Sequence, residues 1–199
     1  MLRKVLILCL VAVGIAVSVR TLYAQTQKFS SLQCEVITED SEVGSSAGKF
    51  FIKGNKVRME INMPGQQGLS LINLSNGEKA YTYFPSQNTA MSMPLAQAKQ
   101  QFVSSDFSQE FNKKNVGEEI VDGRLCDIYE INNPQGGTYK VWVAKDIKFP
   151  VKVDMGKMKI YYKNIQVNTT IEDSLFELPS GVQVQEMGTV LKQQSIDRR

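Results

Sequence analysis

The chain has 199 residues, of which 42% are hydrophobic and 22% charged, a composition typical of one ordinary globular domain and not of a disordered polymer. Its formal net charge of +3 comes from Arg3, Lys4 and Arg20, because the remaining residues carry equal numbers of acidic and basic side chains. A domain with equal numbers of acidic and basic side chains has no net positive charge to attract the phosphates of a nucleic acid. The composition therefore does not favour a nucleic-acid-binding protein.

Residues 1–24 have the features of a secretory signal peptide. Arg3 and Lys4 form a basic start, an apolar run extends from Val5 to Val19, and Ala24 supplies a small residue at the cleavage point. This run is shorter than the roughly 20 residues that span a bilayer, although an uncleaved inner-membrane anchor is the alternative. We therefore expect a periplasmic protein with a single domain over residues 25–187 and a polar tail over residues 188–199.

Short segments of alternating polar and apolar residues, separated by turn residues, predict an antiparallel sheet of about ten strands. Asn76-Gly77 and Asp122-Gly123 are strong two-residue hairpin signals, and a turn is expected at Gly44-Ser45-Ser46. The predicted strands are Gln33–Glu39, Lys49–Ile52, Lys56–Asn62, Leu69–Leu74, Lys79–Phe84, Glu118–Val121, Leu125–Ile131, Tyr139–Ala144, Pro150–Met155 and Lys157–Asn168.

Helical periodicity is confined to a segment after Pro94, where Leu95, Ala98 and Phe102 share one face of the predicted helix. The expected fold is therefore mainly β (α+β): a curved sheet, or incomplete antiparallel β-barrel, with a helical lid over its concave face. Such a lid would enclose an apolar space of the kind in which ligands bind.

Catalytic chemistry has little support in the sequence. The chain contains no histidine, which removes the usual general base and the usual metal ligand. The neighbouring carboxylates Glu118 and Glu119 point to opposite faces of a strand and cannot share a substrate. We therefore predict a protein that is not an enzyme and that has no cofactor and no metal site.

Two cysteines, Cys34 and Cys126, lie in predicted strands of the exported domain. In an oxidising compartment they can form a disulfide, and the alternative is two separate buried thiols that behave as small hydrophobic side chains. The sequence alone does not choose between these alternatives, because it does not give the distance between the two Cα atoms.

Methionines and aromatic residues are the candidates for binding an apolar ligand. Methionine is flexible and polarisable and can adapt to an irregular guest, although the same residues also fill ordinary cores. Tyrosine and tryptophan add an apolar body with a polar rim. The predicted cavity lining is Met59, Ile61, Leu71, Tyr81, Tyr83, Met91, Met93, Phe102 and Trp142, with Arg58 as a polar contact.

Several motifs in order along residues 47–184 resemble the periplasmic carriers of outer-membrane lipoproteins, the LolA-like superfamily. They are Gly48-Lys49-Phe50-Phe51-Ile52-Lys53 with Lys56-Val57-Arg58-Met59-Glu60, then Ser75-Asn76-Gly77 with Tyr81, Tyr83 and Pro85, and finally Asn164–Asn168 with Leu175-Phe176 and Pro179–Val184. Lys53-Gly54-Asn55 lacks the family's proline, so the chain is most similar to divergent, uncharacterised exported relatives. The resemblance implies a half-barrel closed by helices over an apolar cavity.

The sequence thus leads to two hypotheses. The first is a monomeric periplasmic carrier that holds lipoprotein acyl chains or another lipid in an apolar cavity. The alternative is an envelope module that uses the same scaffold to recognise another protein. Neither hypothesis involves nucleic acid.

Overall fold

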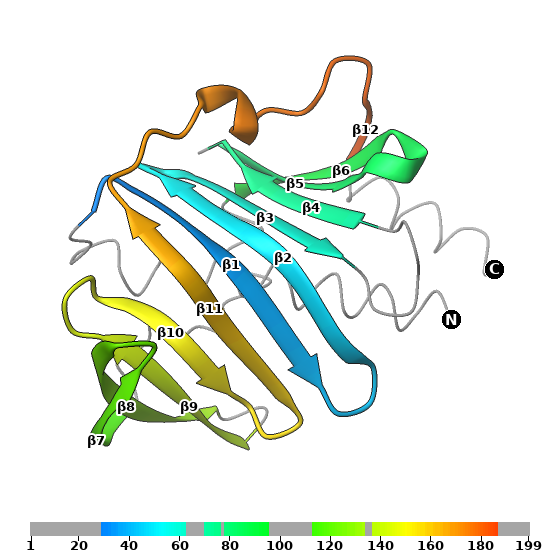
Figure 1. The fold of residues 1–199 in the computed structure, drawn as a ribbon. Coiled ribbons are helices and arrows are strands. Elements are labelled where there is room, and N and C mark those ends of the chain that lie inside the picture. Colours follow the sequence, from blue (N-terminus) through cyan, green and yellow to red (C-terminus); the bar gives the residue numbers. More distant parts are fainter. Residues whose placement is uncertain (1–28, 63–69, 77, 96–112, 134–136, 187–199) are drawn as a thin grey trace.

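The computed structural model describes residues 29–62, 70–76, 78–95, 113–133 and 137–186. These residues form one curved, open sheet of twelve strands in the order β12-β6-β5-β4-β3-β2-β1-β11-β10-β9-β8-β7 (Figure 1). Two meanders, β1 to β6 and β7 to β11, meet where β1 pairs antiparallel with β11. In the part of the chain that the structure describes, no helix is both long enough and apolar enough to cross a membrane.

The first meander supplies one half of the sheet, and the second supplies the other half. The first comprises β1 (Ser31–Asp40), β2 (Gly44–Lys53), β3 (Lys56–Asn62), β4 (Ser70–Ser75), β5 (Lys79–Phe84), the 3-10 turn η1 (Pro85–Gln87) and β6 (Thr89–Pro94). The second comprises β7 (Lys113–Val121), β8 (Arg124–Asn133), β9 (Gly137–Ala144), β10 (Phe149–Asp154) and β11 (Met158–Val167). The 3-10 turn η3 (Asp173–Phe176) and β12 (Gln183–Glu186) follow.

The mainly β class and all ten predicted strands are confirmed, with ends that shift by a few residues. Asp122 and Gly123 both have positive φ, at 48° and 75°, as a tight two-residue hairpin requires. The turn predicted at Gly44-Ser45-Ser46 is wrong, because these residues belong to β2 and the turn occupies residues 41–43. The strands β6 and β12 were not predicted. The predicted lid helix lies outside the described residues, apart from Leu95.

One face of the sheet, here called the core face, carries the main hydrophobic core. Residues paired across antiparallel strands share a face, so Leu32, Cys34 and Val36 of β1 lie on the same side as their β2 partners. Phe50 of β2, Tyr162 of β11 and Phe149 of β10 have ring centroids 5.3 to 6.1 Å apart. This aromatic cluster joins the two meanders at the centre of the sheet.

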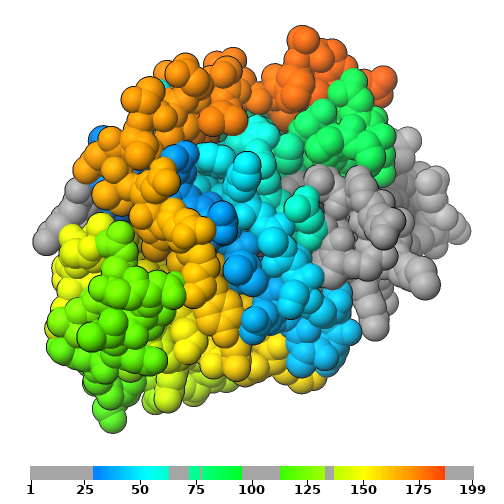
Figure 2. Space-filling model, viewed as in Figure 1, coloured from blue at the N-terminus to red at the C-terminus, as the bar shows by residue number. Residues whose placement is uncertain are grey.

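The opposite face, here called the outer face, is crossed by the segment 169–182, here called the strap (orange in Figures 1 and 2). Lys53 Nζ donates to the Ile171 carbonyl at 2.7 Å, and Arg58 Nη1 donates to the Leu175 carbonyl at 2.7 Å. Ile171 and Phe176 are buried, with 3% and 0% of their surface exposed. The strap therefore covers part of the outer face and brings the chain to β12, which pairs parallel with β6.

Candidate ligand-binding site

A continuous row of residues crosses the core face at the end of the sheet that contains β3 to β6. Phe50 of β2 pairs with Met59 of β3, and Met59 pairs with Asn73 of β4. Asn73 pairs with Thr82 of β5, and Thr82 pairs with Met91 of β6. Directly opposite residues point to the same face, so this row places two polar side chains between two methionines.

The neighbouring row has the same character, with short side chains at its centre. Val57 of β3 pairs with Ser75 of β4, Ser75 with Ala80 of β5, and Ala80 with Met93 of β6. Ser75, Ala80 and Met93 are 4%, 5% and 7% exposed. In these two rows, β4 and β5 carry Asn73, Ser75, Ala80 and Thr82, while β3 carries Val57 and Met59 and β6 carries Met91 and Met93.

The amide of Asn73 is the most unusual polar group on this face. Thr82 Oγ1 donates to Asn73 Oδ1 at 2.9 Å, and Asn73 is 4% exposed while Thr82 is 9% exposed. Among the described residues, the buried side-chain atoms Asn73 Nδ2 and Thr169 Oγ1 have no hydrogen-bond partner. Native proteins rarely leave a buried donor unpaired, because the lost hydration is costly.

Four of the predicted lining residues lie on one face. Met59, Ile61, Met91 and Met93 share the core face, and Leu71 is the register partner of Ile61. Met59 and Met93 are buried, whereas Ile61 and Met91 are half-buried. The predicted lining thus includes the methionines of this face but not Asn73 or Thr82, which lie between them. The pattern of a single strand gave no signal for these two, because their meeting depends on the register of β4 against β5.

Tyr81 and Tyr83 do not join this group. They pair with Leu74 and Ile72, so they lie on the outer face, opposite to Asn73 and Thr82. The prediction that they line the same cavity as Met59 is therefore wrong. The physical reason is the two-residue period of a strand, which places the tyrosines one position out of register with the core face.

Arg58 also lies on the outer face, and its predicted role as a polar contact of the cavity is wrong. It pairs with Phe51 and Leu74, away from Met59. Its side chain is only 13% exposed. Nε donates to Glu60 Oε1 at 2.8 Å, and Nη1 donates to the Leu175 carbonyl of the strap. Arg58 therefore fastens the strap to the sheet.

Trp142 is also separate from the site. It pairs with Ile128 and Lys152, the Lys152 Nζ lies 4.1 Å from the centroid of its ring, and its Nε1 donates to Glu119 Oε2 at 2.6 Å. Four strands, β2, β1, β11 and β10, lie between β3 and β9 in the sheet order. Trp142 therefore packs within the second meander. Phe102 lies outside the described residues.

Cys34 and Cys126 are both buried, and both are free thiols in the structure. The structure thus agrees with the second alternative, two separate buried thiols. They lie in β1 and β8, which three strands separate, a path of about 19 Å along the sheet at about 4.8 Å per strand. A disulfide requires Cα atoms within about 7 Å. Burial raises the pKa of the Cys34 thiol far above its ordinary value, and burial is also the main cause that raises the pKa of Cys126.

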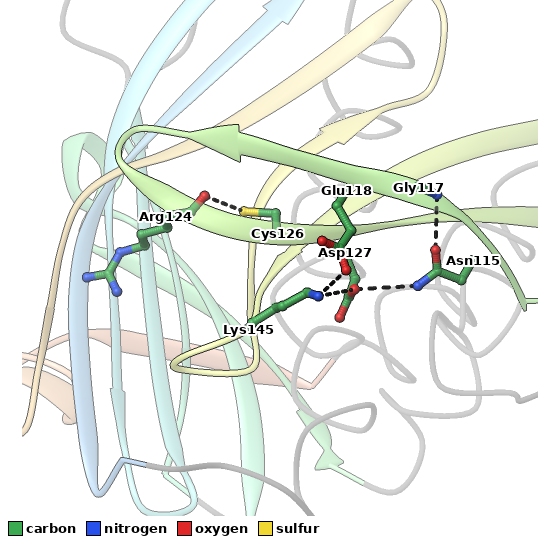
Figure 3. A network of polar contacts seen from close by, with 7 residues as sticks. All are labelled: Asn115, Gly117, Glu118, Arg124, Cys126, Asp127 and Lys145. Carbon is green, nitrogen blue, oxygen red and sulfur yellow. Dashed lines mark hydrogen bonds and ion pairs between the residues drawn. The ribbon is translucent and has the colours of Figure 1, made fainter.

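A polar network lies on the β7–β8 hairpin and the turn that follows β9, remote from the core-face site (Figure 3). Lys145 forms ion pairs with Glu118 and with Asp127, the second at 3.2 Å. Hydrogen bonds to Glu118 and then to Asp127 raise the pKa of the Lys145 ammonium. The adjoining residues 122–125, 145 and 146 line an open cleft of about 490 Å³.

The same hairpin exposes apolar side chains at the edge of the sheet. Ile120 of β7 is 69% exposed, and its cross-strand partner Leu125 is 47% exposed. Val116 of β7 is 41% exposed. Within the described ranges β7 is an edge strand, paired only with β8. The hairpin forms the lower left corner of the molecule in Figure 2 (yellow-green).

The fold defines a class of protein built on one open, curved and mainly antiparallel sheet, and solved structures share it. An uncharacterised conserved protein from Thermus thermophilus is similar with a TM-score of 0.62 and 11% identity, over 83% of this chain and 94% of that protein. MucB in the Pseudomonas aeruginosa MucA/MucB complex gives a TM-score of 0.54 and 12% identity, over 86% of this chain and 62% of that one. These likenesses show the fold.

The sequence family is a narrower result. Residues 34–149 match the model of a domain of unknown function, DUF4412, and the chain belongs to this family. The uncharacterised protein MJ0687 of Methanocaldococcus jannaschii is 25% identical in an alignment 159 positions long that covers 74% of this chain and 45% of that protein. The chain thus spans slightly less than half the length of the curated relative it matches.

Proposed function

We propose that the protein is an exported, non-catalytic carrier that binds an acyl chain or a comparable apolar ligand over the core face of β3 to β6. One observation carries the proposal: the shorter side chains Asn73, Ser75, Ala80 and Thr82 lie in two rows between Val57 and Met59 of β3 and the methionines Met91 and Met93 of β6. An elongated apolar guest fits over short side chains, and flexible methionine thioethers on both sides can adapt to it.

The energetics of this role need no covalent step. Each methylene group removed from water contributes about 0.8 kcal/mol, so an acyl chain supplies several kcal/mol before the costs of ordering. Ser75, Ala80 and Thr82 are buried in the structure. The proposal therefore includes a change of rotamer by the neighbouring methionines Met91 and Met93 when the ligand enters. Methionine can do this at low cost because it is unbranched and has three rotatable bonds.

The periplasmic location, the monomeric state and the relation to lipoprotein carriers are parts of the same proposal. The basic and apolar character of residues 1–24 supports the location, and the ordered motifs between Gly48 and Val184 support the relation to lipoprotein carriers. The open curved sheet agrees with the fold that those motifs imply.

Substitution of Met91 tests the proposal. Met91→Gln keeps the length of the side chain but makes the flank of the site polar, and Met155→Gln is the matched control at a half-buried methionine in the turn between β10 and β11. We expect Met91→Gln to weaken binding of a fluorescent fatty-acyl probe about 10-fold while Met155→Gln leaves it unchanged. Equal affinities in both variants, or no binding by the wild type, would refute the assignment of the site.

A second candidate function, recognition of an envelope protein, is favoured by a different observation. The β7–β8 hairpin exposes Val116 and Ile120 of β7 and Leu125 of β8 to solvent, and the open cleft lies at its turn. An edge strand with exposed apolar residues can pair with an extended segment of a partner. Ile120→Lys would then abolish capture of a defined envelope protein in a pull-down and leave binding of the acyl probe intact. Capture unaffected by Ile120→Lys would exclude the hairpin as the interface.

A further inference from the structure

The side-chain amide of Asn73 has one satisfied and one unsatisfied hydrogen-bonding group on the core face. Its oxygen is fixed by the hydroxyl of Thr82 at 2.9 Å, which sets the orientation of the amide group. Its nitrogen is buried and, among the described residues, finds no acceptor. An alternating strand would place an apolar side chain at this position at lower cost, so a polar residue here requires a reason.

The surroundings of Asn73 define the chemistry of a complementary group. Met59 and Met91 flank the Asn73–Thr82 pair on the core face. A ligand that fits this row is apolar along most of its length and carries one acceptor at the level of Asn73. A carbonyl oxygen within an acyl compound meets both requirements.

The charge of the site selects among carbonyl compounds. The core-face positions of β3 to β6 described here, from Val57 on β3 to Met93 on β6, include no lysine or arginine. Lys53, Lys56 and Arg58 lie on the outer face, where they contact the strap. Lys49 of β2 and Lys79 of β5 also occupy outer-face positions, because they pair with Glu60 and Pro94. Burial of a carboxylate without a cation is far more costly than burial of a neutral ester or amide.

We infer that the site selects neutral acyl esters or amides, and that Asn73 Nδ2 donates a hydrogen bond to the carbonyl oxygen of the ligand. This inference rests on the proposed function and specifies its ligand class. Asn73 acts here as a specificity residue and Thr82 as the residue that positions its amide. Free fatty acids in the carboxylate form and plain hydrocarbons bind less well.

Competition with a fluorescent acyl probe tests the ligand class. The competitors are methyl palmitate, palmitate near neutral pH and an n-alkane of matched length. We expect wild-type protein to bind the ester about 5- to 100-fold more tightly than the alkane, because the alkane leaves the buried amide nitrogen unpaired. The ester is also expected to exceed the carboxylate. A preference for the carboxylate, or equal binding of ester and alkane, would overturn the inference and leave the carrier function standing.

The double variant Asn73→Leu with Thr82→Val assigns the preference to these residues. It replaces both hydrogen-bonding partners by apolar groups of similar shape, so the fold is expected to survive with an unchanged or raised Tm. The ester preference should fall to about 1-fold while alkane affinity is kept. Retention of the ester preference by this variant would refute the role of Asn73. Failure of the wild type to bind any of the three competitors or the probe would instead refute the carrier function itself.

Discussion

Gly48 of β2 lies where the neighbouring strand leaves no room for a Cβ atom, so even Gly48→Ala should destabilise the fold. It pairs with Val36 of β1 and Ile61 of β3, next to the candidate site. A Cβ atom at this position would lie 1.8 Å from the Glu60 backbone oxygen and 2.9 Å from its carbonyl carbon. These atoms belong to the backbone of β3, so no side-chain rotation can relieve the contact.

The cost of Gly48→Ala follows from this geometry. A carbon and an oxygen atom in a close but tolerated contact are about 3.3 Å apart, so β2 and β3 would have to separate by about 1.5 Å. That displacement breaks one or two ladder hydrogen bonds and strains the packing of the neighbouring side chains. At about 1 kcal/mol for each bond plus about 1 to 2 kcal/mol for strain, the free energy of unfolding should fall by about 2 to 4 kcal/mol.

Urea unfolding followed by tryptophan fluorescence measures this loss, since Trp142 lies in the core cluster. Gly123→Ala is the matched control, because it changes glycine to alanine at a φ of 75° with no atom within 4 Å. The control should lose about 1 kcal/mol from backbone strain alone. A loss for Gly48→Ala that is smaller than that of the control would refute the close approach of β2 and β3.

Three further predictions concern the strap and the thiols. Arg58→Met keeps the apolar stem of the side chain but removes its hydrogen bonds to Glu60 and to the Leu175 carbonyl. We expect the free energy of unfolding, measured in urea, to fall by about 1.5 to 3 kcal/mol. An unchanged free energy would show that the strap is held without Arg58. Hydrogen bonds from Lys56 and, to a lesser extent, Lys53 lower the pKa of Asp173 in the folded protein below its ordinary value of 3.8. The stability that Asp173 contributes is therefore fully present above pH 3.8 and is lost as the pH falls through the pKa of the folded state. The difference in urea midpoint between wild type and Asp173→Asn should therefore exist near neutral pH and vanish in acid; a difference that persists in acid would contradict this. Iodoacetamide should modify Cys34 and Cys126 only after unfolding, with equal yield whether or not a reductant is added first; a yield that depends on reductant would indicate a disulfide.

The strands were predictable where alternation and turn chemistry agreed. Lys56–Asn62 and Lys79–Phe84 match β3 and β5 residue for residue. The missed strand β6 contains Thr89-Ala90-Met91-Ser92-Met93-Pro94, in which the residues have weak β propensity and the proline suggests a break. It forms a strand because it pairs with β5 and β12 on its two sides, and sequence alone does not show that pairing.

The candidate site was only half predictable, for a related reason. Residue types such as methionine indicated apolar side chains, but which of them meet depends on the register of the pairing. A shift of one position separates Tyr81 from Thr82 and places them on opposite faces. The polar pair Asn73–Thr82 was invisible because it depends on β4 and β5 being aligned so that these two residues face each other.

The two faces of β3 have different roles: the outer face contributes hydrogen bonds that stabilise the fold, and the core face contributes side chains to the candidate site. The outer face holds the strap through Lys56 and Arg58, whose partners are backbone carbonyls and carboxylates at fixed positions. The core face of the same strand carries Met59 and Ile61, which make no directional bonds and can repack. Because successive residues of a strand point to opposite faces, changes in the strap should alter stability without altering ligand class, while changes at Asn73 should alter ligand class without loosening the strap.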